Sequence, residues 1–259
     1  AECSPGQAHC LIRLSRGGGD AVVIREYDLK EKRFAAQGFT LPEAKTDASY
    51  LNDGAILFAS DFGPGTMTTS GYARIVKLWR RGTPVSGAKT VFEGQVQDVL
   101  SAPATYHTRL GDFALAIRAV SFFENEYYAI APDGAARKLD LPLGADVKGM
   151  IGDALIATLR QAWNTKAGSF PKGALIAWRE NAPTQLLYAP DARQSIEDVS
   201  VGRDAVYAAI TDNVIGSIHA FRPKGGGWSD DVLNLPSGGS AGIASVDDFG
   251  PEALFRFES

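Results

Sequence analysis

The chain has 259 residues, of which 45% are hydrophobic and 22% are charged, and its formal net charge is −4. Acidic and basic residues are mixed along the whole chain, so there is no basic stripe that would hold phosphates, and nucleic acid is not expected as a partner. No stretch approaches the roughly 18 apolar residues of a membrane span. The length and the even composition predict one soluble domain over residues 1–259.

Short apolar strands, separated by turn residues, are predicted along the chain. The clearest group of four strands covers residues 48–51, 55–61, 73–80 and 89–93, and a turn, Arg81-Gly82-Thr83-Pro84, separates the last two. Short segments rich in β-branched and aromatic residues, bounded by Gly, Pro, Asn and Asp, are typical of antiparallel strands. No helix is expected to interrupt them.

An acidic residue followed by an apolar strand recurs about every 50 residues. The five copies begin at Asp53, Asp112, Asp153, Asp204 and Glu252. A repeat of this length with four strands predicts an all-β fold, a β-propeller of four-stranded antiparallel blades. The chain is expected to hold about four complete blades and two partial ones, the first partial blade over residues 1–39 and the last one with two strands. It therefore looks truncated at both ends.

The innermost strand of each blade is expected to line the axis of a propeller. Residues near these positions form one candidate group, although alternation along a strand turns about half of them toward neighbouring blades. They are Tyr50, Val99, Met150, Val199 and Ala244.

A long loop between two strands of one blade is the candidate contact surface. It covers residues 61–71, and long loops carry function more often than cores do. The candidate residues in and beside it are Asp61, Phe62, Tyr72 and Arg74. Asp61-Phe62-Gly63 copies the magnesium-binding triplet of protein kinases, but the other kinase motifs are missing. The alternative is an ordinary solvated connection.

A G-x-S-x-G pattern around Ser240 invites comparison with a nucleophile elbow. In an α/β-hydrolase the catalytic histidine follows the serine. Here His9, His107 and His219 all precede Ser240, and the 19 residues after it are predicted to form two strands rather than a helix. We therefore expect no catalytic residue in this chain and place Ser240 in a connection between blades.

Other motif-like segments have simpler interpretations. Gly17-Gly18-Gly19 and Gly225-Gly226-Gly227 are predicted to be hairpin turns rather than phosphate loops. Asp230-Asp231 and Asp247-Asp248 are expected to be solvated turn carboxylates, so neither a metal nor another cofactor is expected. Cys3 and Cys10 either form a disulfide or remain free thiols, and the sequence leaves both possibilities open.

Several segments resemble the propeller of prolyl-oligopeptidase-family serine peptidases. The resemblance extends over nearly the whole chain, is strongest from Cys10 to Gly94 and becomes looser after His107. Its segments are residues 11–18, 25–29, 38–39, 41–45, 68–72, 74–77, 79–84, 91–94 and 173–175.

The resemblance implies an N-terminal propeller, seven-bladed in the intact family domain, that caps a C-terminal α/β-hydrolase domain bearing a Ser-Asp-His triad. That domain would be the partner absent from this chain, and the propeller would admit peptides while excluding folded proteins. The alternative function is a stand-alone propeller that binds a protein or peptide partner. The compartment, cytoplasmic or periplasmic, stays open.

Overall fold

The computed structural model describes residues 1–166, 168–236 and 238–259. Within these ranges the chain forms 25 strands and a single turn of 3-10 helix, η1 (Val85–Gly87). The all-β prediction is therefore confirmed. In the same ranges no helix is long and apolar enough to cross a membrane.

The first sheet contains five strands instead of the partial unit expected from the sequence. Two of its strands are two residues long, too short to produce the alternating pattern that reveals a strand. A further strand, Thr40–Ala44, pairs with the third strand of the sheet. The strands are β1 (Glu2–Cys3), β2 (His9–Ser15), β3 (Val22–Asp28), β4 (Arg33–Phe34) and β5 (Thr40–Ala44).

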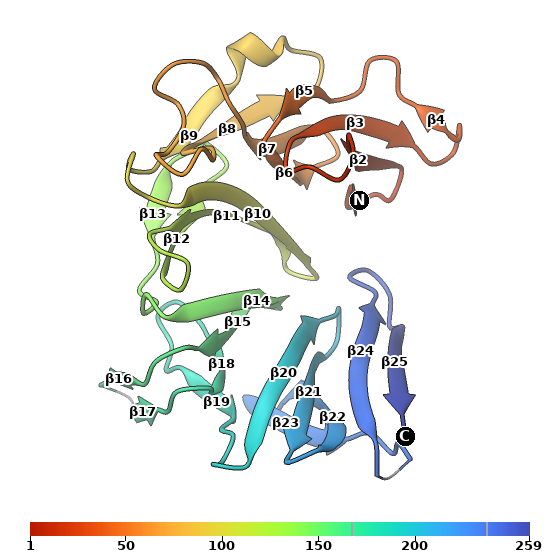
Figure 1. Cartoon of the computed structure of the whole chain (residues 1–259), viewed down its shortest axis with the longest axis vertical. Helices are drawn as coiled ribbons and strands as arrows, with labels where there is room; N and C mark the ends of the chain where they lie inside the picture. Colours follow the sequence, from red (N-terminus) through yellow and green to blue (C-terminus); the bar gives the residue numbers. More distant parts are fainter. Residues whose placement is uncertain (167, 237) are drawn as a thin grey trace. The chain divides into compact units, whose positions relative to one another are not determined.

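The next two sheets each have four antiparallel strands in chain order (Figure 1). The four strands predicted for the clearest group are all present in the second sheet. That sheet consists of β6 (Asp47–Asn52), β7 (Ala55–Ala59), β8 (Ile75–Arg80) and β9 (Lys89–Glu93). The third sheet consists of β10 (Leu100–Thr108), β11 (Gly111–Ala119), β12 (Asn125–Ile130) and β13 (Ala136–Lys138).

The remaining sheets repeat this pattern with one insertion. The fourth sheet holds β14 (Ala145–Ile151), β15 (Ala154–Leu159), β18 (Leu175–Trp178) and β19 (Gln185–Tyr188). A separate ladder of β16 (Trp163–Thr165) and β17 (Gly168–Phe170) is inserted after β15. The fifth sheet holds β20 (Gln194–Val201), β21 (Val206–Asp212), β22 (Ile215–Lys224) and β23 (Gly227–Val232), and the last pair is β24 (Ser240–Val246) and β25 (Ala253–Glu258).

The glycine triplets lie at hairpin turns, as the sequence predicts. Lys224 pairs with Gly227, so Gly225 and Gly226 are the two loop residues between β22 and β23. Their φ angles of 58° and 81° lie in the left-handed region, which two-residue hairpins require and glycine adopts without strain. The first triplet lies in a longer connection between β2 and β3, residues 16–21, because Ser15 pairs with Val22.

The described chain forms two compact units. Unit 1 comprises residues 1–106 and 112–143, and unit 2 comprises residues 107–111 and 144–259. In unit 2 the fourth and fifth sheets share a core to which β15 contributes Ile156 and β21 contributes Ile210. The core of unit 1 positions the candidate loop.

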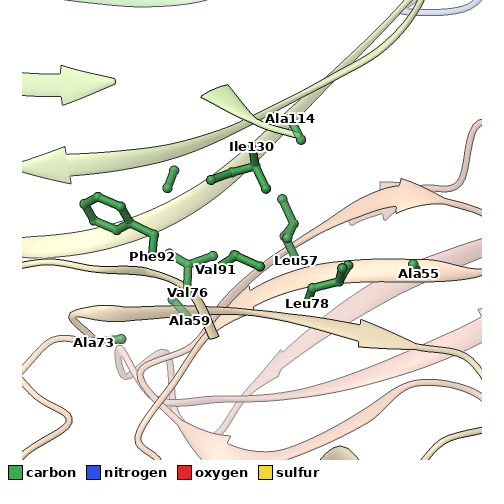
Figure 2. Close-up of a cluster of buried hydrophobic side chains, with 11 residues drawn as sticks. Ala55, Leu57, Ala59, Ala73, Val76, Leu78, Val91, Phe92, Ala114 and Ile130 are labelled. Atoms are coloured by element: carbon green, nitrogen blue, oxygen red, sulfur yellow. The ribbon is translucent and has the colours of Figure 1, made fainter. Parts of the chain in front are cut away.

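Strand β7 is buried on both faces because it lies between two other sheets of unit 1. Ile56 and Phe58 point into the core shared with the first sheet. Ala55, Leu57 and Ala59 point to the other side, where Figure 2 shows Leu57 near Ile130 and Ala114 of the third sheet. Full burial of one Leu, Ile or Phe contributes about 1.5 to 3 kcal/mol. The face-to-face packing of sheets therefore stabilises the strand that leads into the candidate loop.

Candidate functional site

The connection between β7 and β8 begins with a tight local turn at Asp61. Its Oδ1 atom accepts a hydrogen bond from the Gly63 amide at 2.8 Å. The Phe62 amide donates to Thr66 Oγ1 at 3.0 Å, and Thr66 Oγ1 donates to the Gly63 carbonyl at 2.7 Å. Asp61 is exposed, and its carboxylate shapes the start of the loop.

The ring of Phe62 is held between an aromatic and a cationic side chain. It meets Phe58 edge to face, with ring centroids 5.3 Å apart. Lys77 Nζ lies 4.1 Å from the centroid of the Phe62 ring, within the range of a cation–π contact. Phe62 is half-buried, and it anchors the loop to the core and to β8.

Tyr72 connects the far end of the loop to the turn between β2 and β3. Its hydroxyl donates to Asp20 Oδ2 at 3.1 Å. Lys45 Nζ lies 4.1 Å from the Tyr72 ring centroid and 3.7 Å from Asp20 Oδ2. Each member of this small cluster comes from a different connection between strands. The cluster therefore fixes the turn against the candidate loop.

Arg74 fastens the loop through backbone carbonyls. Its Nε and Nη2 atoms donate to the Gly65 carbonyl at 2.9 and 2.6 Å. Its Nη1 atom donates to the Gly94 carbonyl at 3.1 Å and pairs with Glu93. The guanidinium is therefore committed to holding this loop and the end of β9 together, and it is not displayed for a ligand.

Replacing Arg74 with methionine is expected to loosen the loop while the β-sheets remain. The loss of hydrogen bonds from a charged donor to two carbonyls should lower the free energy of unfolding by about 1 to 3 kcal/mol. Hydrogen exchange at the amides of Thr66 and Thr68 should accelerate. Arg16→Met, in an exposed turn, is the matched control. Unchanged exchange at both amides in the Arg74 variant would contradict this role.

The loop continues into two neighbouring connections through main-chain hydrogen bonds. The Thr69 amide donates to the Val96 carbonyl at 2.8 Å. The hydroxyls of Thr68 and Ser70 donate to the Val99 carbonyl at 3.0 and 2.6 Å, and the Val99 amide donates to the Ala119 carbonyl at 2.8 Å. Residues 60–74, 94–99 and 120–124, all in unit 1, therefore form a set of linked connections, here called the loop rim.

A buried ion-pair network beneath the loop rim is not apparent from the sequence. Asp98 is buried and accepts hydrogen bonds from Arg118 Nε and Nη2 at 2.7 and 2.9 Å. Arg118 Nη1 also donates to Glu126 at 3.0 Å. The hydrogen bonds to Asp98 raise the pKa of Arg118 above its ordinary value. The partners are 20 and 8 residues apart in sequence, and only the packing of strands brings them together.

A second network joins the first two sheets around Glu26, whose side chain is fully buried. Glu26 accepts hydrogen bonds from Arg81 at 2.6 and 2.7 Å, from the Tyr50 hydroxyl at 2.6 Å and from the Phe39 amide at 3.2 Å. Burial by itself would raise the pKa of Glu26, but the hydrogen bonds from Arg81 and Tyr50 outweigh it and hold the pKa below its ordinary value. Burial raises the pKa of Tyr50, and so does the bond to Glu26.

The two cysteines, for which the sequence left both states open, are bridged. Cys3 and Cys10 lie opposite each other on β1 and β2 and form a disulfide. The preceding residue, Glu2, accepts hydrogen bonds from Ser49 Oγ and the Tyr50 amide, each at 2.8 Å. The disulfide therefore holds a short edge strand that connects the first sheet to the second.

Ser240 is the first residue of β24 and pairs with Glu258, so its placement in a connection between blades was wrong by one residue. The pairing of β24 with β25 begins at this residue. The histidines have other neighbours. His219 Nδ1 lies 2.8 Å from Asp230 Oδ1, the ring of His107 stacks on Phe249, and His9 lies 3.8 Å from Asp28.

The paired aspartates differ from the expected turn carboxylates in one case. Asp230 and Asp231 lie within β23 and contact His219 and Arg222, because the ladder with β22 extends to Val232, the last residue of β23. Asp247 does occupy a turn, where its carboxylate accepts the Phe249 amide at 2.8 Å. Among the described residues no group of three His, Cys, Asp or Glu side chains lies close enough to hold a metal ion.

The residues expected near a propeller axis lie in or beside the first strand of their sheets. Tyr50, Met150, Val199 and Ala244 lie in β6, β14, β20 and β24, and Val99 directly precedes β10. Tyr50 and Val199 are buried in cores shared with neighbouring sheets, which is the orientation that strand alternation predicts for part of this group. An axial position for any of them stays a prediction.

Comparison with known proteins identifies the fold class to which these four-stranded antiparallel sheets belong. The chain matches the family described as the prolyl oligopeptidase N-terminal β-propeller domain over residues 1–259. The fold is thus a β-propeller domain. The chain belongs to the N-terminal propeller family of prolyl oligopeptidases, as its sequence resemblance implied.

Individual relatives agree with this assignment. The chain is 31% identical to an uncharacterized peptidase of Sinorhizobium fredii, over 95% of this chain and 36% of the relative. A post-proline cleaving enzyme from Rickettsia typhi has a TM-score of 0.91 at 24% identity, over 100% of this chain and 41% of that one. Oligopeptidase B from Trypanosoma brucei has a TM-score of 0.67 at 14% identity, over 100% and 36% of the two chains. The chain therefore spans about two fifths of the length of these relatives or less.

Proposed function

We propose that this propeller is the non-catalytic domain of a prolyl-oligopeptidase-like serine peptidase, which controls the access of peptides to a C-terminal α/β-hydrolase domain and docks on it. The observation that carries the proposal is the family match over residues 1–259, together with relatives that extend well beyond the matched part. The relatives include proteins named as peptidases.

The side chains of this chain support a structural role better than a catalytic one. The side chains of Arg74 and Tyr72, which carry polar groups at the end of the candidate loop, are engaged in contacts that fix neighbouring connections. Ser240 lies at the start of a strand and not at a strand-to-helix turn. A rigid framework of packed sheets is suited to steric selection, because a filter discriminates by size only if its walls hold their position.

A serine-directed fluorophosphonate probe tests the non-catalytic part of the proposal. The 259-residue chain is expected to form no adduct, whereas the full-length parent protein should be labelled at one serine beyond Ser259. Mass mapping of the labelled peptides identifies the site, and Ser240→Ala in the parent is the control that should not reduce labelling. An adduct on Ser240 would make this domain itself the hydrolase. An unlabelled parent would favour a stand-alone binding propeller.

Access control has a separate test in the full-length protein. The same proline-containing sequence is supplied once as a short fluorogenic peptide and once within a loop of a folded protein. The parent is expected to cleave the short peptide and to leave the folded protein intact, because only the peptide passes a narrow entrance. Equal cleavage of both substrates would exclude steric selection, even if serine labelling succeeds.

A further inference from the structure

The tip of the β11–β12 hairpin presents two adjacent aromatic side chains to solvent. The exposed fractions are 83% for Phe122 and 68% for Phe123. Aromatic side chains exposed together are costly to hydrate and are enriched at interfaces, where they bury large areas at little entropic cost. A tip with this composition indicates a contact surface.

The hairpin tip is held by its own hydrogen bonds. The Val120 amide donates to the Glu124 carbonyl at 2.9 Å, and Ser121 Oγ donates to Glu124 Oε2 at 3.1 Å. The Phe123 amide donates to Ser121 Oγ at 3.3 Å. Because the turn is fixed in this way, the two rings are presented with little backbone freedom left to lose on binding.

Other exposed apolar side chains of unit 1 lie on connections that are hydrogen-bonded to the hairpin. Val96, 42% exposed, belongs to the loop rim, which is joined to the hairpin by the bond between Val99 and Ala119. Leu143, also 42% exposed, accepts a hydrogen bond from the Asn125 amide at the base of the hairpin. At the opposite strand ends of unit 1, Leu29 and Val85 are exposed singly, on separate connections.

The charged groups beneath the tip are already paired. Arg118 lies between Asp98 and Glu126, and Lys138 also pairs with Glu126. Hydrogen bonds from Lys138 and Tyr128 outweigh the effect of burial and lower the pKa of Glu126, so this carboxylate stays ionised and hydrogen-bonded at neutral pH. The tip therefore offers aromatic surface on a closed polar base, which suits an apolar partner surface better than a charged one.

We infer that Phe122 and Phe123, together with Val96 of the adjoining connection, form the apolar contact by which this propeller docks on the C-terminal domain of its own parent protein. The inference rests on the proposed function and names the surface that it uses. The matched family is described as an N-terminal domain, and the relatives of this chain are more than twice as long as the chain itself. A partner tethered in the same polypeptide is present at high effective concentration, so a small apolar patch is sufficient for the contact.

Photocrosslinking in the full-length parent tests this surface. Phe123→p-benzoylphenylalanine places a crosslinker at the tip, and Val85→p-benzoylphenylalanine is the matched control at the opposite strand ends of unit 1. Both positions are exposed, so folding should be unaffected, which thermal unfolding of each variant verifies. Irradiation of dilute protein is expected to give an intramolecular crosslink from position 123 to a segment beyond Ser259. The variant with the crosslinker at position 85 is expected to give no such crosslink.

Three outcomes would overturn the inference. They are the absence of a crosslink from position 123, a covalent dimer as the main product, and equal crosslinking from position 85. Fluorophosphonate labelling of the same preparations separates this inference from the proposed function. A labelled serine beyond Ser259 without a crosslink from position 123 refutes only the docking surface, whereas an unlabelled parent refutes the proposed function as well.

Discussion

Replacing Arg81 with methionine is expected to lower the free energy of unfolding by about 3 to 5 kcal/mol, because the change leaves a buried carboxylate without its counter-charge. The Glu26 side chain is fully buried, while that of Arg81 is 32% exposed. Methionine retains most of the aliphatic packing of arginine and removes its charge. Equilibrium unfolding in urea, with the slope unchanged, provides the measurement.

A double substitution identifies the cause of this loss. Glu26→Gln removes the buried charge and leaves one amide oxygen, which can accept from either the Tyr50 hydroxyl or the Phe39 amide, because these two donors bond to different oxygens of Glu26. The Glu26→Gln/Arg81→Met protein is therefore expected to be more stable than Arg81→Met alone, a coupling that simple loss of packing would not produce. A double variant that is less stable than the single one would contradict the electrostatic explanation.

The pH dependence of the free energy of unfolding is an independent test of the electrostatic explanation. In the native protein the pKa of Glu26 is held below its ordinary value of 4.5, so its stabilising contribution is present above that pH and is lost as pH falls through the folded pKa. In Arg81→Met the effect of burial is opposed by fewer groups, and the pKa should rise. The stability difference between the two proteins should therefore be largest near pH 7 and shrink as the pH falls from the higher pKa of Glu26 in the variant to its lowered pKa in the native protein.

Replacing both cysteines with serine is expected to lower the free energy of unfolding by about 2 to 3 kcal/mol, the loop-closure contribution of a short disulfide loop. Cys3 and Cys10 are seven residues apart. Without the bridge, the two-residue strand β1 has little to hold it against β2. Denaturant unfolding of the oxidised protein, the reduced protein and the double serine variant measures the effect.

The cysteine prediction extends to the hydrogen bonds of Glu2. Glu2→Ala should be destabilising in the oxidised protein, where the carboxylate accepts from Ser49 and the Tyr50 amide. In the double serine variant the same substitution should have a smaller effect, since β1 is then already displaced. Equal effects in both backgrounds would mean that β1 keeps its position without the disulfide.

Much of the fold could be predicted from the sequence because its main strands are long enough to alternate and are bounded by strong turn residues. The prediction for residues 89–93 matches β9 at both ends. Strands β1 and β4 were missed because two residues carry no periodicity. The ladder of β16 and β17 was missed because an insertion of this kind lies outside the repeat.

The candidate loop could be located from the sequence, but the roles of its side chains could not. Its length and its glycines mark a connection, whereas the partners of Tyr72 and Arg74 lie 52 and 20 residues away and depend on how sheets pack. The same reason hides the Glu26 network, in which Arg81 is 55 residues from its partner. The exposure of Phe122 and Phe123 could not be predicted either. Large hydrophobic residues are usually buried, so the sequence alone would place both rings in the core.

Two of the hydrogen bonds that join the segments of the loop rim are made by backbone groups alone. The bonds from Thr69 to Val96 and from Val99 to Ala119 join amide to carbonyl and do not depend on the identity of those side chains. Outward-facing residues such as Val96 and Phe122 can therefore be exchanged during evolution, or by design, while the loops stay in place. The apolar contact residues of such a surface can therefore diverge between related propellers without a change in the scaffold that carries them.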